Sequence, residues 1–538
     1  MRESMLRPAT NYDALWKQVD FANFSIPEFL NLGVVCVDEQ DPDNRAMTVV
    51  ATDGTSTDHT FGELREQSNR LANALGELGI RPGDVVGVVN PQSWETGVAY
   101  MALFRMGAIV LPLSSLFGPD ALAYRLRHGQ ARAVITSAAN AARVREALRE
   151  GEHVPVLLIG ADPAGPGELA YDQSLAAASA EFEPVRTRAD DPAILIYTSG
   201  TTGDPKGALH AHRVLFGHIT AFEMIYEFYP QPEDVLSSPA DWAWLAGIMN
   251  ILVPAWYYGL PIVVDLDTKF SPERAIWLMR TFRVTLTVLH ATALRMIRAT
   301  GLSGGGFALR VVASGGEAIG ADLLAWSADF FGGRVNEGYG QTELNASLGN
   351  CELFPTKPGS LGRPFPGTVV AVLDDNGTPV IGRVGEIAVD RNHPNLMLGY
   401  WRNPEATEEK FRGDWMLSGD LGVQDEDGYF WFESRKDDVI KSSGYRIGPG
   451  EIEACLGSHP AVAMSAVVGA PDERRGEVPK AFVVLRAGRE PGDELADELQ
   501  TYVRHRLAAH EVPREIAFLH DLPKTTTGKI MRRALRGR

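Results

Sequence analysis

A loop rich in glycine and small hydroxyl residues, with a single lysine, occupies positions 197–207 of the chain. It follows the apolar run 193–196, which predicts a buried strand. Backbone N–H groups and hydroxyls in such a loop can surround phosphate oxygens, because glycine allows unusual dihedral angles and close approach. Composition alone would equally favour a flexible surface loop, and Gly207 after Lys206 differs from the P-loop, where Ser or Thr follows the lysine. We expect phosphate contacts from Thr198, Ser199, Gly200, Thr201, Thr202, Gly203 and Lys206.

Two further runs carry residue types that suit a nucleotide. The run 310–314 predicts a strand that leads into Gly315 and Gly316, and glycines at the end of a strand let a flat ligand approach the backbone. Between positions 336 and 343, the ring of Tyr339 could stack on a base, and the carboxylate of Glu343 could hold Mg²⁺ beside phosphates. Each of these residues alone would more often be structural.

Three features in the last third of the chain could also serve a nucleotide-binding enzyme. Asp420 follows a glycine and suits a bidentate contact to two ribose hydroxyls, although an aspartate in a turn is commonplace. The charged run 433–438 lies between apolar stretches and predicts a linker or hinge. Lys529 stands in the polar loop 522–530, where a lysine is usually only a solvated charge.

The composition bounds the class of protein. A chain of 538 residues with 45% hydrophobic and 22% charged residues predicts a globular protein of two or more domains. A net charge of −18 argues against binding to nucleic acid or to an anionic membrane surface. The three cysteines are widely spaced, which argues against a metal site or a disulfide framework. No signal peptide or membrane span is expected, so the prediction is a cytoplasmic enzyme.

The order of apolar patterns predicts the fold class. From Phe61, leucines at helical spacing predict a helix that ends near Gly79. Short apolar runs at 84–89, 108–111, 133–136 and 156–159 alternate with helix-length stretches, which predicts an α/β fold with largely parallel sheets. The stretch 161–184 is expected to be a surface excursion, and the last hundred residues a small α+β domain.

Taken together, these motifs resemble the adenylate-forming (AMP-binding) superfamily in order and spacing over nearly the whole chain. The runs 437–449 and 475–482 are most similar to the medium-chain acyl-CoA synthetase branch. The resemblance implies a large N-terminal AMP-binding domain of α/β subdomains, residues 1–435, which holds the acyl pocket. It also implies a small, mobile C-terminal α+β lid, residues 436–538, with the hinge, the CoA-tunnel loop and the catalytic lysine.

The resemblance further implies an ATP- and Mg²⁺-dependent ligase that makes an acyl-AMP and pyrophosphate, and then acyl-CoA and AMP. Lys529, Lys206 and Thr342 would be catalytic, Glu343 would carry the metal, and Asp437 would be the hinge. The implied ATP or AMP contacts beyond the phosphate loop are Gly315, Gly316, Glu317, Tyr339, Gly340, Gln341, Thr342, Asp420, Arg435, Arg446 and Lys529. The implied coenzyme A contacts are Ser443, Gly444 and Tyr445.

The size of the acid also follows from the resemblance. Two-carbon members typically carry Trp where Gly340 stands, and Ala246 and Gly247 beside Trp244 would widen the acyl pocket. A medium-chain, branched or aromatic monocarboxylic acid is therefore expected. The alternatives are a propionate-like short-chain synthetase, a stand-alone adenylation enzyme that loads a carrier protein, a luciferase-like oxygenase, and a non-catalytic nucleotide-binding protein. A homodimer, and a lysine acetyltransferase or deacetylase acting on Lys529, are left open as partners.

Overall fold

The structure is a computed structural model of the chain, and its internal contacts form two compact units. Unit 1 comprises Met1–Val369 and Val389–Met416, and unit 2 comprises Val370–Ala388 and Leu417–Arg538. The structure describes residues 2–19, 26–148, 153–165, 167–198, 204–316, 319–442, 445–472, 475–507, 511–524 and 530–536.

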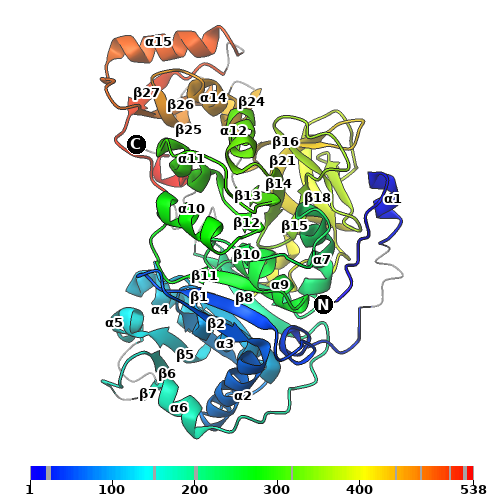
Figure 1. The fold of residues 1–538 in the computed structure, drawn as a ribbon. Helices are drawn as coiled ribbons and strands as arrows, with labels where there is room; N and C mark the ends of the chain where they lie inside the picture. Colours follow the sequence, from blue (N-terminus) through cyan, green and yellow to red (C-terminus); the bar gives the residue numbers. More distant parts are fainter. Residues whose placement is uncertain are drawn as a thin grey trace. The chain divides into compact units, whose positions relative to one another are not determined.

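The first sheet of unit 1 has eight strands in the order β19-β9-β8-β4-β3-β5-β6-β7. Its central strands pair in parallel, as the alternation of strand and helix patterns predicts, whereas β8 and β9 pair antiparallel. Its helices are drawn in blue and cyan in Figure 1. The strands are β3 (Val85–Val89), β4 (Ile109–Leu113), β5 (Ala131–Ser137), β6 (Val156–Ile159), β7 (Glu168–Ala170), β8 (Pro192–Thr198), β9 (Lys206–Ala211) and β19 (Gly399–Tyr400).

The second sheet of unit 1 follows the order β16-β15-β14-β13-β12-β10-β11-β1-β2. The strands from β14 to β1 pair in parallel, and β15 and β2 add antiparallel neighbours. Its strands are β1 (Arg45–Val50), β2 (Ser56–Thr60), β10 (Leu236–Ser237), β11 (Ile262–Asp265), β12 (Leu286–Val288), β13 (Val311–Gly315), β14 (Arg334–Gln341), β15 (Asn345–Gly349) and β16 (Ser360–Pro364). A further short strand of unit 1 is β20 (Phe411–Arg412).

Some helices of unit 1 begin where the sequence supplies a side-chain cap. The helix expected from Phe61 is α2, which starts with a capping box between Thr60 and Glu63 and buries Leu64, Leu71 and Leu75. The helices of unit 1 are α1 (Tyr12–Trp16), α2 (Phe61–Glu77), α3 (Trp94–Met106), α4 (Pro119–His128), α5 (Ala138–Ala147), α6 (Tyr171–Ala177), α7 (Val214–Ile225), α8 (Leu245–Gly247), α9 (Val253–Tyr257), α10 (Pro272–Thr281), α11 (Ala291–Ala299), α12 (Ala321–Phe331), α13 (Pro404–Glu408) and the π-helices η1 (Val34–Asp38) and η2 (Ile248–Leu252).

Unit 2 contains a five-stranded sheet covered by two helices, drawn mostly in orange in Figure 1. Leu499 and Val503 lie one turn apart on α15 and are fully buried with Leu456 of α14. The predicted boundary at residues 435–437 falls inside unit 2, and the assignment 1–435 and 436–538 stays a prediction. The elements are β17 (Val370–Leu373), β18 (Gly385–Asp390), β21 (Trp415–Gln424), β22 (Phe430–Arg435), β23 (Ile440–Ser442), β24 (Tyr445–Ile447), β25 (Val462–Asp472), β26 (Gly476–Leu485), β27 (Glu515–Phe518), α14 (Pro449–Gly457), α15 (Asp493–Arg504) and the 3₁₀ turn η3 (Arg532–Ala534).

The stretch 161–184 is more ordered than its composition predicts. In its described part, β7 adds an edge strand in parallel with β6, and α6 buries Tyr171 and Leu175. The apolar positions in this stretch are few, but they are enough for one short helix to pack on the sheet.

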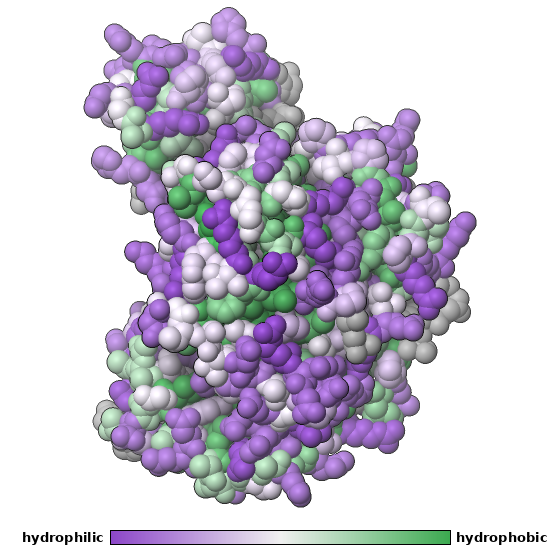
Figure 2. Space-filling view, in the orientation of Figure 1, coloured by the Kyte–Doolittle hydropathy of each residue, from purple (hydrophilic) through white to green (hydrophobic). Residues whose placement is uncertain are grey.

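Polar residues cover most of the face drawn in Figure 2. Within the described ranges, no helix combines the length and the apolar character that a membrane crossing requires.

The N-terminal segment is fastened to the core of unit 1 by a buried carboxylate. Glu223 lies on α7, and its two oxygens accept backbone N–H groups of Met5 at 2.7 Å and Leu6 at 2.6 Å. The hydroxyl of Tyr258 donates to the same carboxylate. Burial raises the pKa of Glu223 from 4.5 to about 8, although these hydrogen bonds oppose the shift.

This pKa gives a prediction for stability. Between pH 4.5 and about 8, folded Glu223 holds a proton that the unfolded chain has lost, so stability falls as the pH rises through this window. Glu223→Gln cannot ionise. Measured by calorimetry, the Tm of the variant minus that of the wild type should therefore increase from about pH 5 to about pH 8. Glu146→Gln, at an exposed glutamate, is the control, and a difference independent of pH would contradict the prediction.

Candidate active site

The predicted phosphate loop is the connection of an antiparallel β-hairpin. Thr198 ends β8 and pairs with Lys206, the first residue of β9. The hydroxyl of Thr198 donates to the carbonyl of Lys206 at 3.4 Å, and Lys206 is half-buried. Ser199, Gly200, Thr201, Thr202 and Gly203 lie outside the described residues.

Tyr400 connects this hairpin to the predicted metal ligand. The strand β19 pairs with β9, so that Tyr400 is the partner of Ala208. The Nζ atom of Lys206 lies 5.3 Å from the centre of the Tyr400 ring. The Tyr400 hydroxyl donates to Oε1 of Glu343 at 2.7 Å. Sequence reasoning missed Tyr400, because no local motif marks it.

Thr342 and Glu343 occupy the turn between β14 and β15. The carbonyl of Glu343 accepts the backbone N–H of Met397 at 2.9 Å, so the segment before β19 fixes the backbone here as well as the side chain. A carboxylate beside a phosphate loop supplies the hard oxygen donor that Mg²⁺ prefers, and the ion commonly takes its other ligands from water and substrate phosphates. Glu343 therefore fits the predicted metal role. Elsewhere in the described part of the chain, no three His, Cys, Asp or Glu side chains gather as a metal site.

The residues predicted for adenine lie at the carboxyl ends of two neighbouring parallel strands. Gly315 of β13 pairs with Gly338 of β14, next to Tyr339. Gly316 has a φ of +79°, a left-handed conformation that favours glycine. His290 is within 2.8 Å of the Gly315 carbonyl through Nδ1, and it was not predicted. The structure thus brings Gly315, Gly316 and Tyr339 together, whereas Glu317 lies outside the described residues.

Two predicted pocket glycines have a structural reason of their own. A Cβ atom on Gly340 would lie 2.0 Å from the carbonyl oxygen of Asn345, and one on Gly247 would lie 2.4 Å from that of Asp241. These neighbours are backbone atoms, so no side chain fits without movement of the strand or turn. The contacts explain both glycines without an acyl pocket, and their predicted role stays a prediction.

The other predicted pocket residues lie near Gly247. Trp244 is half-buried, and its ring lies edge-on to that of Phe117, with the centroids 6.1 Å apart. Ala246 is exposed, and Trp242 is almost fully buried. Trp242 therefore belongs to the core, whereas Trp244 has a partly free ring.

Buried histidines beside the phosphate hairpin were also missed. His210 on β9 and the following His212 are fully buried, and burial lowers their pKa values to about 4 and about 3. The backbone of Thr342 and the charge of Glu343 partly oppose this effect at His210. Both histidines are therefore neutral at pH 7. Their spacing of two along a strand was the available sequence signal, since it places both on one face.

In unit 2, the two residues predicted for the ribose are cross-strand neighbours. Asp420 of β21 pairs with Arg435 of β22, and their side chains form an ion pair at 3.2 Å. Asp437 lies in the turn that follows β22, 3.4 Å from the guanidinium of Arg435. Arg446 and Tyr445 lie on β24, but their side chains are outside the described part. Ser443, Gly444 and Lys529 also lie outside the described residues.

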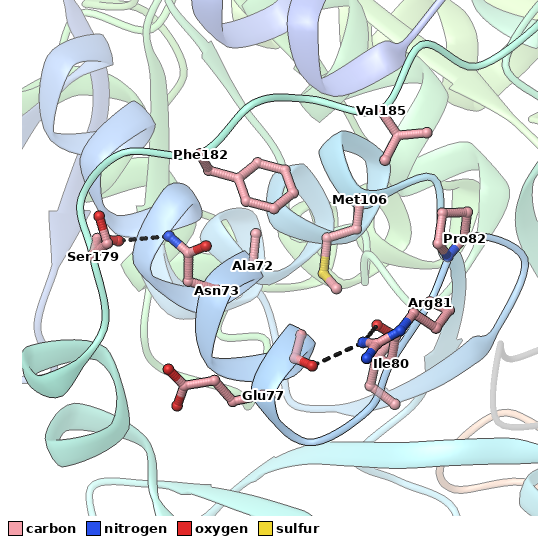
Figure 3. Close-up of a pocket in the computed structure, with 11 residues that line it drawn as sticks. Ala72, Asn73, Glu77, Ile80, Arg81, Pro82, Met106, Ser179, Phe182 and Val185 are labelled. Atoms are coloured by element: carbon pink, nitrogen blue, oxygen red, sulfur yellow. Dashed lines mark hydrogen bonds between the residues drawn. The ribbon is translucent and has the colours of Figure 1, made fainter.

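A surface pocket of about 460 Å³ at the C-terminal end of α2 holds none of the predicted site residues. Figure 3 shows Met106, Phe182 and Val185 lining it. Asn73 and Arg81 donate to backbone carbonyls at its rim, where they fasten the loop 179–181 and the end of the helix. Its polar groups are therefore structural, and we do not assign the reaction to it.

The comparisons with known proteins identify the family of the chain. The family model for the AMP-binding enzyme matches residues 37–401, and that for the AMP-binding enzyme C-terminal domain matches residues 451–529. An acetyl-coenzyme A synthetase of Bacillus subtilis (strain 168) is 36% identical over 487 residues, covering 89% of this chain and 84% of that protein. The mitochondrial acyl-coenzyme A synthetase ACSM5 of Mus musculus is 34% identical over 547 residues, covering 98% and 94%. The crystal structure of the anthranilate CoA ligase AuaEII with anthranoyl-AMP matches with a TM-score of 0.84 at 28% identity, covering 95% and 97%.

The chain belongs to the AMP-binding, adenylate-forming enzyme family. Since its relatives are named acyl-CoA synthetases, the chain is an acid–thiol ligase of the acyl-CoA synthetase type. The family, the α/β fold with a small C-terminal domain and the enzyme class predicted from the sequence are confirmed.

Tyr400→Phe tests the link between Lys206 and Glu343. The variant keeps the ring near Lys206 and removes the hydroxyl that donates a hydrogen bond to Glu343. A hydrogen bond to a charged group is worth about 1.5–3 kcal/mol, so kcat/KM for adenylation should fall by about ten- to a hundredfold. Pyrophosphate exchange measures this step. Tyr12→Phe, which removes a hydroxyl that donates to the carbonyl of Pro364, should change it little. Equal rates for Tyr400→Phe and wild type would show that the hydrogen bond has no part in adenylation.

Proposed function

We propose that the protein is an ATP- and Mg²⁺-dependent acyl-CoA synthetase that first joins its acid to AMP and then transfers the acyl group to coenzyme A. The observation that carries the proposal is the group formed by Lys206, Tyr400 and Glu343, beside the phosphate hairpin. Relatives with the same fold have been crystallised with ATP and with an acyl-AMP, which supports a nucleotide at the corresponding place.

Adenylation brings several anions together, and the residues of unit 1 would offset their repulsion. A carboxylate attacks the α-phosphate and pyrophosphate leaves, so negative charge builds up on the phosphate oxygens. Lys206, at the end of the hairpin, would hold a phosphate through its ammonium group, and Thr342 would donate a hydroxyl. Glu343 would bind Mg²⁺, which would supply further positive charge to the phosphates. Tyr400 would keep the Glu343 carboxylate oriented toward them.

The nucleoside contacts that we propose are those expected from the sequence. The ring of Tyr339 and the backbone at Gly315, Gly316 and Glu317 offer a flat surface for adenine, with Gly340 and Gln341 alongside. Asp420 would accept hydrogen bonds from the ribose hydroxyls, with Arg435 holding that carboxylate by their ion pair. Ser443, Gly444 and Tyr445 would contact coenzyme A, and Arg446 belongs to the same hairpin. Between adenylation and thioester formation, rotation about Asp437 would take Lys529 away from the reacting groups and bring this hairpin to them instead.

The acid we propose is a medium-chain, branched or aromatic monocarboxylic acid, held beside Trp244, Ala246, Gly247 and Gly340. The half-buried ring of Trp244 supports this proposal, because it offers an apolar wall. Two relatives point to different sizes, since one is named an acetyl-coenzyme A synthetase and another an anthranilate CoA ligase. A short-chain substrate is therefore the second candidate.

A panel of acids distinguishes these readings. AMP release would be measured with ATP and Mg²⁺, with and without coenzyme A, for straight acids from acetate to decanoate, isobutyrate, benzoate and anthranilate. We expect release that depends on coenzyme A and peaks at an acid larger than propionate. Each buried methylene contributes about 0.8 kcal/mol, or roughly fourfold in kcat/KM. A peak at acetate or propionate would favour the short-chain synthetase. Pyrophosphate exchange with an acid, but no AMP release stimulated by coenzyme A, would favour carrier-protein loading or an oxygenase.

Lys529→Ala should separate the two half-reactions. The variant removes the charge proposed to bridge the acid and the α-phosphate, so adenylation should fall by about a hundredfold or more. Thioester formation from supplied acyl-AMP should stay within about threefold of wild type, because the rotated unit would present a different face. Acetylation of Lys529 would have the same selectivity, since it also removes the charge. Equal losses in both half-reactions would refute this role for the lysine.

A further inference from the structure

The C-terminal segment 530–536 is bound tightly to the rest of unit 2. Ile530 forms a β-bridge with Lys524, and the backbone N–H of Met531 donates to the carbonyl of Pro523 at 2.8 Å. Leu535, five residues after Ile530, is fully buried against Leu522 and neighbouring apolar side chains of the sheet. The bridge joins the described residues on either side of positions 525–529, so contacts that hold this segment also hold the two ends of that stretch.

Arg532 anchors the segment to two carboxylates. One guanidinium nitrogen lies 2.7 Å from Glu453 of α14, and another lies 3.3 Å from Asp438. Its Nε also donates to Glu453 at 3.1 Å. The Glu453 carboxylate is itself fixed, because it accepts the backbone N–H of Val467 at 2.7 Å.

Arg536 gives a second attachment to the same place. Its Nη2 lies 2.8 Å from the other oxygen of Asp438 and donates to the backbone carbonyl of Asp437 at 2.7 Å. One carboxylate is thus held by two arginines of the C-terminal segment. The side chains of Arg532, Asp438 and Glu453 are 23%, 13% and 16% exposed, so water and salt screen these pairs less than ordinary surface pairs.

These ion pairs connect the residues after the proposed hinge with the C-terminal segment, which lies nearly a hundred positions later in the sequence. Asp438 directly follows the proposed hinge residue Asp437, and Arg532 lies three positions after Lys529. A change of backbone angle at Asp437 therefore acts on the residue that the C-terminal arginines hold. Two arginines of the C-terminal segment thus bind the same carboxylate, that of Asp438.

We propose that Arg532 and Arg536 are positioning residues for adenylation. They hold the residues on either side of positions 525–529 to Asp438 and Glu453, which ties the stretch that contains Lys529 to the residues just after the proposed hinge. This inference rests on the proposed function, because it concerns how Lys529 is brought to the acid and the α-phosphate. Lys529 delivers the charge, and the arginines determine where it is delivered.

The test compares Arg532→Ala with Arg533→Ala. Arg533 is the next residue of the same turn, is exposed, and has no ion pair with any residue that the structure describes. Both variants lose one positive charge. For Arg532→Ala we expect the kcat of adenylation to fall by about tenfold or more, since misplacing a reacting group by about 1 Å can cost a hundredfold. Its thioester formation from supplied acyl-AMP, and both half-reactions of Arg533→Ala, should stay within about twofold of wild type.

Hydrogen exchange of the full-length protein gives a readout independent of activity. Peptides that span residues 523–531 should exchange faster in Arg532→Ala than in the wild type or Arg533→Ala, because their anchor is lost. Arg532→Lys should recover only part of the adenylation rate, since an ammonium group cannot contact both carboxylates in the same fork geometry. Asp438→Asn keeps the side-chain shape and weakens both pairs to that residue, so it should reproduce the selective loss even if Arg532→Ala folds poorly.

The outcomes separate this inference from the proposed function. If the wild type makes acyl-AMP and Lys529→Ala selectively loses that step, the proposed function stands. The inference is then overturned if Arg532→Ala and Asp438→Asn adenylate at the wild-type rate. It is also overturned if both lose the two half-reactions equally, or if Arg533→Ala shows the same loss as Arg532→Ala. A wild type that makes no acyl-AMP from any acid would instead remove the proposed function on which the inference rests.

Discussion

The pairing of β19 with β9 is the constraint on which the candidate site of unit 1 depends. The phosphate hairpin belongs to one sheet, whereas the strands that carry Gly315 and Tyr339 belong to the other. Only a connection between the two sheets can hold phosphate and base residues at a fixed separation. The segment 397–401 makes that connection, because it bonds to the Glu343 carbonyl, to β9 and, through Tyr400, to the Glu343 carboxylate.

Much of this arrangement could be predicted from local sequence. The hydroxyl-rich loop after a buried strand, and the glycines at the end of β13, are properties of neighbouring residues, and the structure places Gly315 beside the strand of Tyr339 as expected. Tyr400 could not be found in this way. Its role comes from pairing with a strand nearly two hundred positions earlier, and a lone Gly-Tyr pair carries no local signal of such a partner.

The glycines show that one residue can have more than one structural reason. Gly340 was expected to leave room for an acid, because a missing side chain leaves space. In the structure the position that a Cβ atom on Gly340 would take is filled by the backbone at Asn345, across an irregularity in the pairing of β14 and β15, which gives this glycine a structural reason in addition to the predicted one. A glycine can thus permit a ligand or a neighbouring strand to approach, and only coordinates distinguish the two. The buried histidines were missed for the opposite reason, since polar side chains in a core owe their state to surroundings that the sequence does not display.

The connection between the two sheets is also short. The strand β19 has only two residues, and the N–H groups of Leu398 and Trp401 donate to β9 at its two ends. Other contacts reinforce it, because Leu396, Met397 and Tyr400 are buried and the indole N–H of Trp401 donates to the carbonyl of His128 at 3.2 Å. Through Tyr400, this short strand places one side chain beside both Lys206 of the first sheet and Glu343 at the end of β14 in the second. A nucleotide that contacted residues of both sheets would therefore add to the bonds that hold this segment in place, and amide exchange at Leu398 and Trp401 would report its binding.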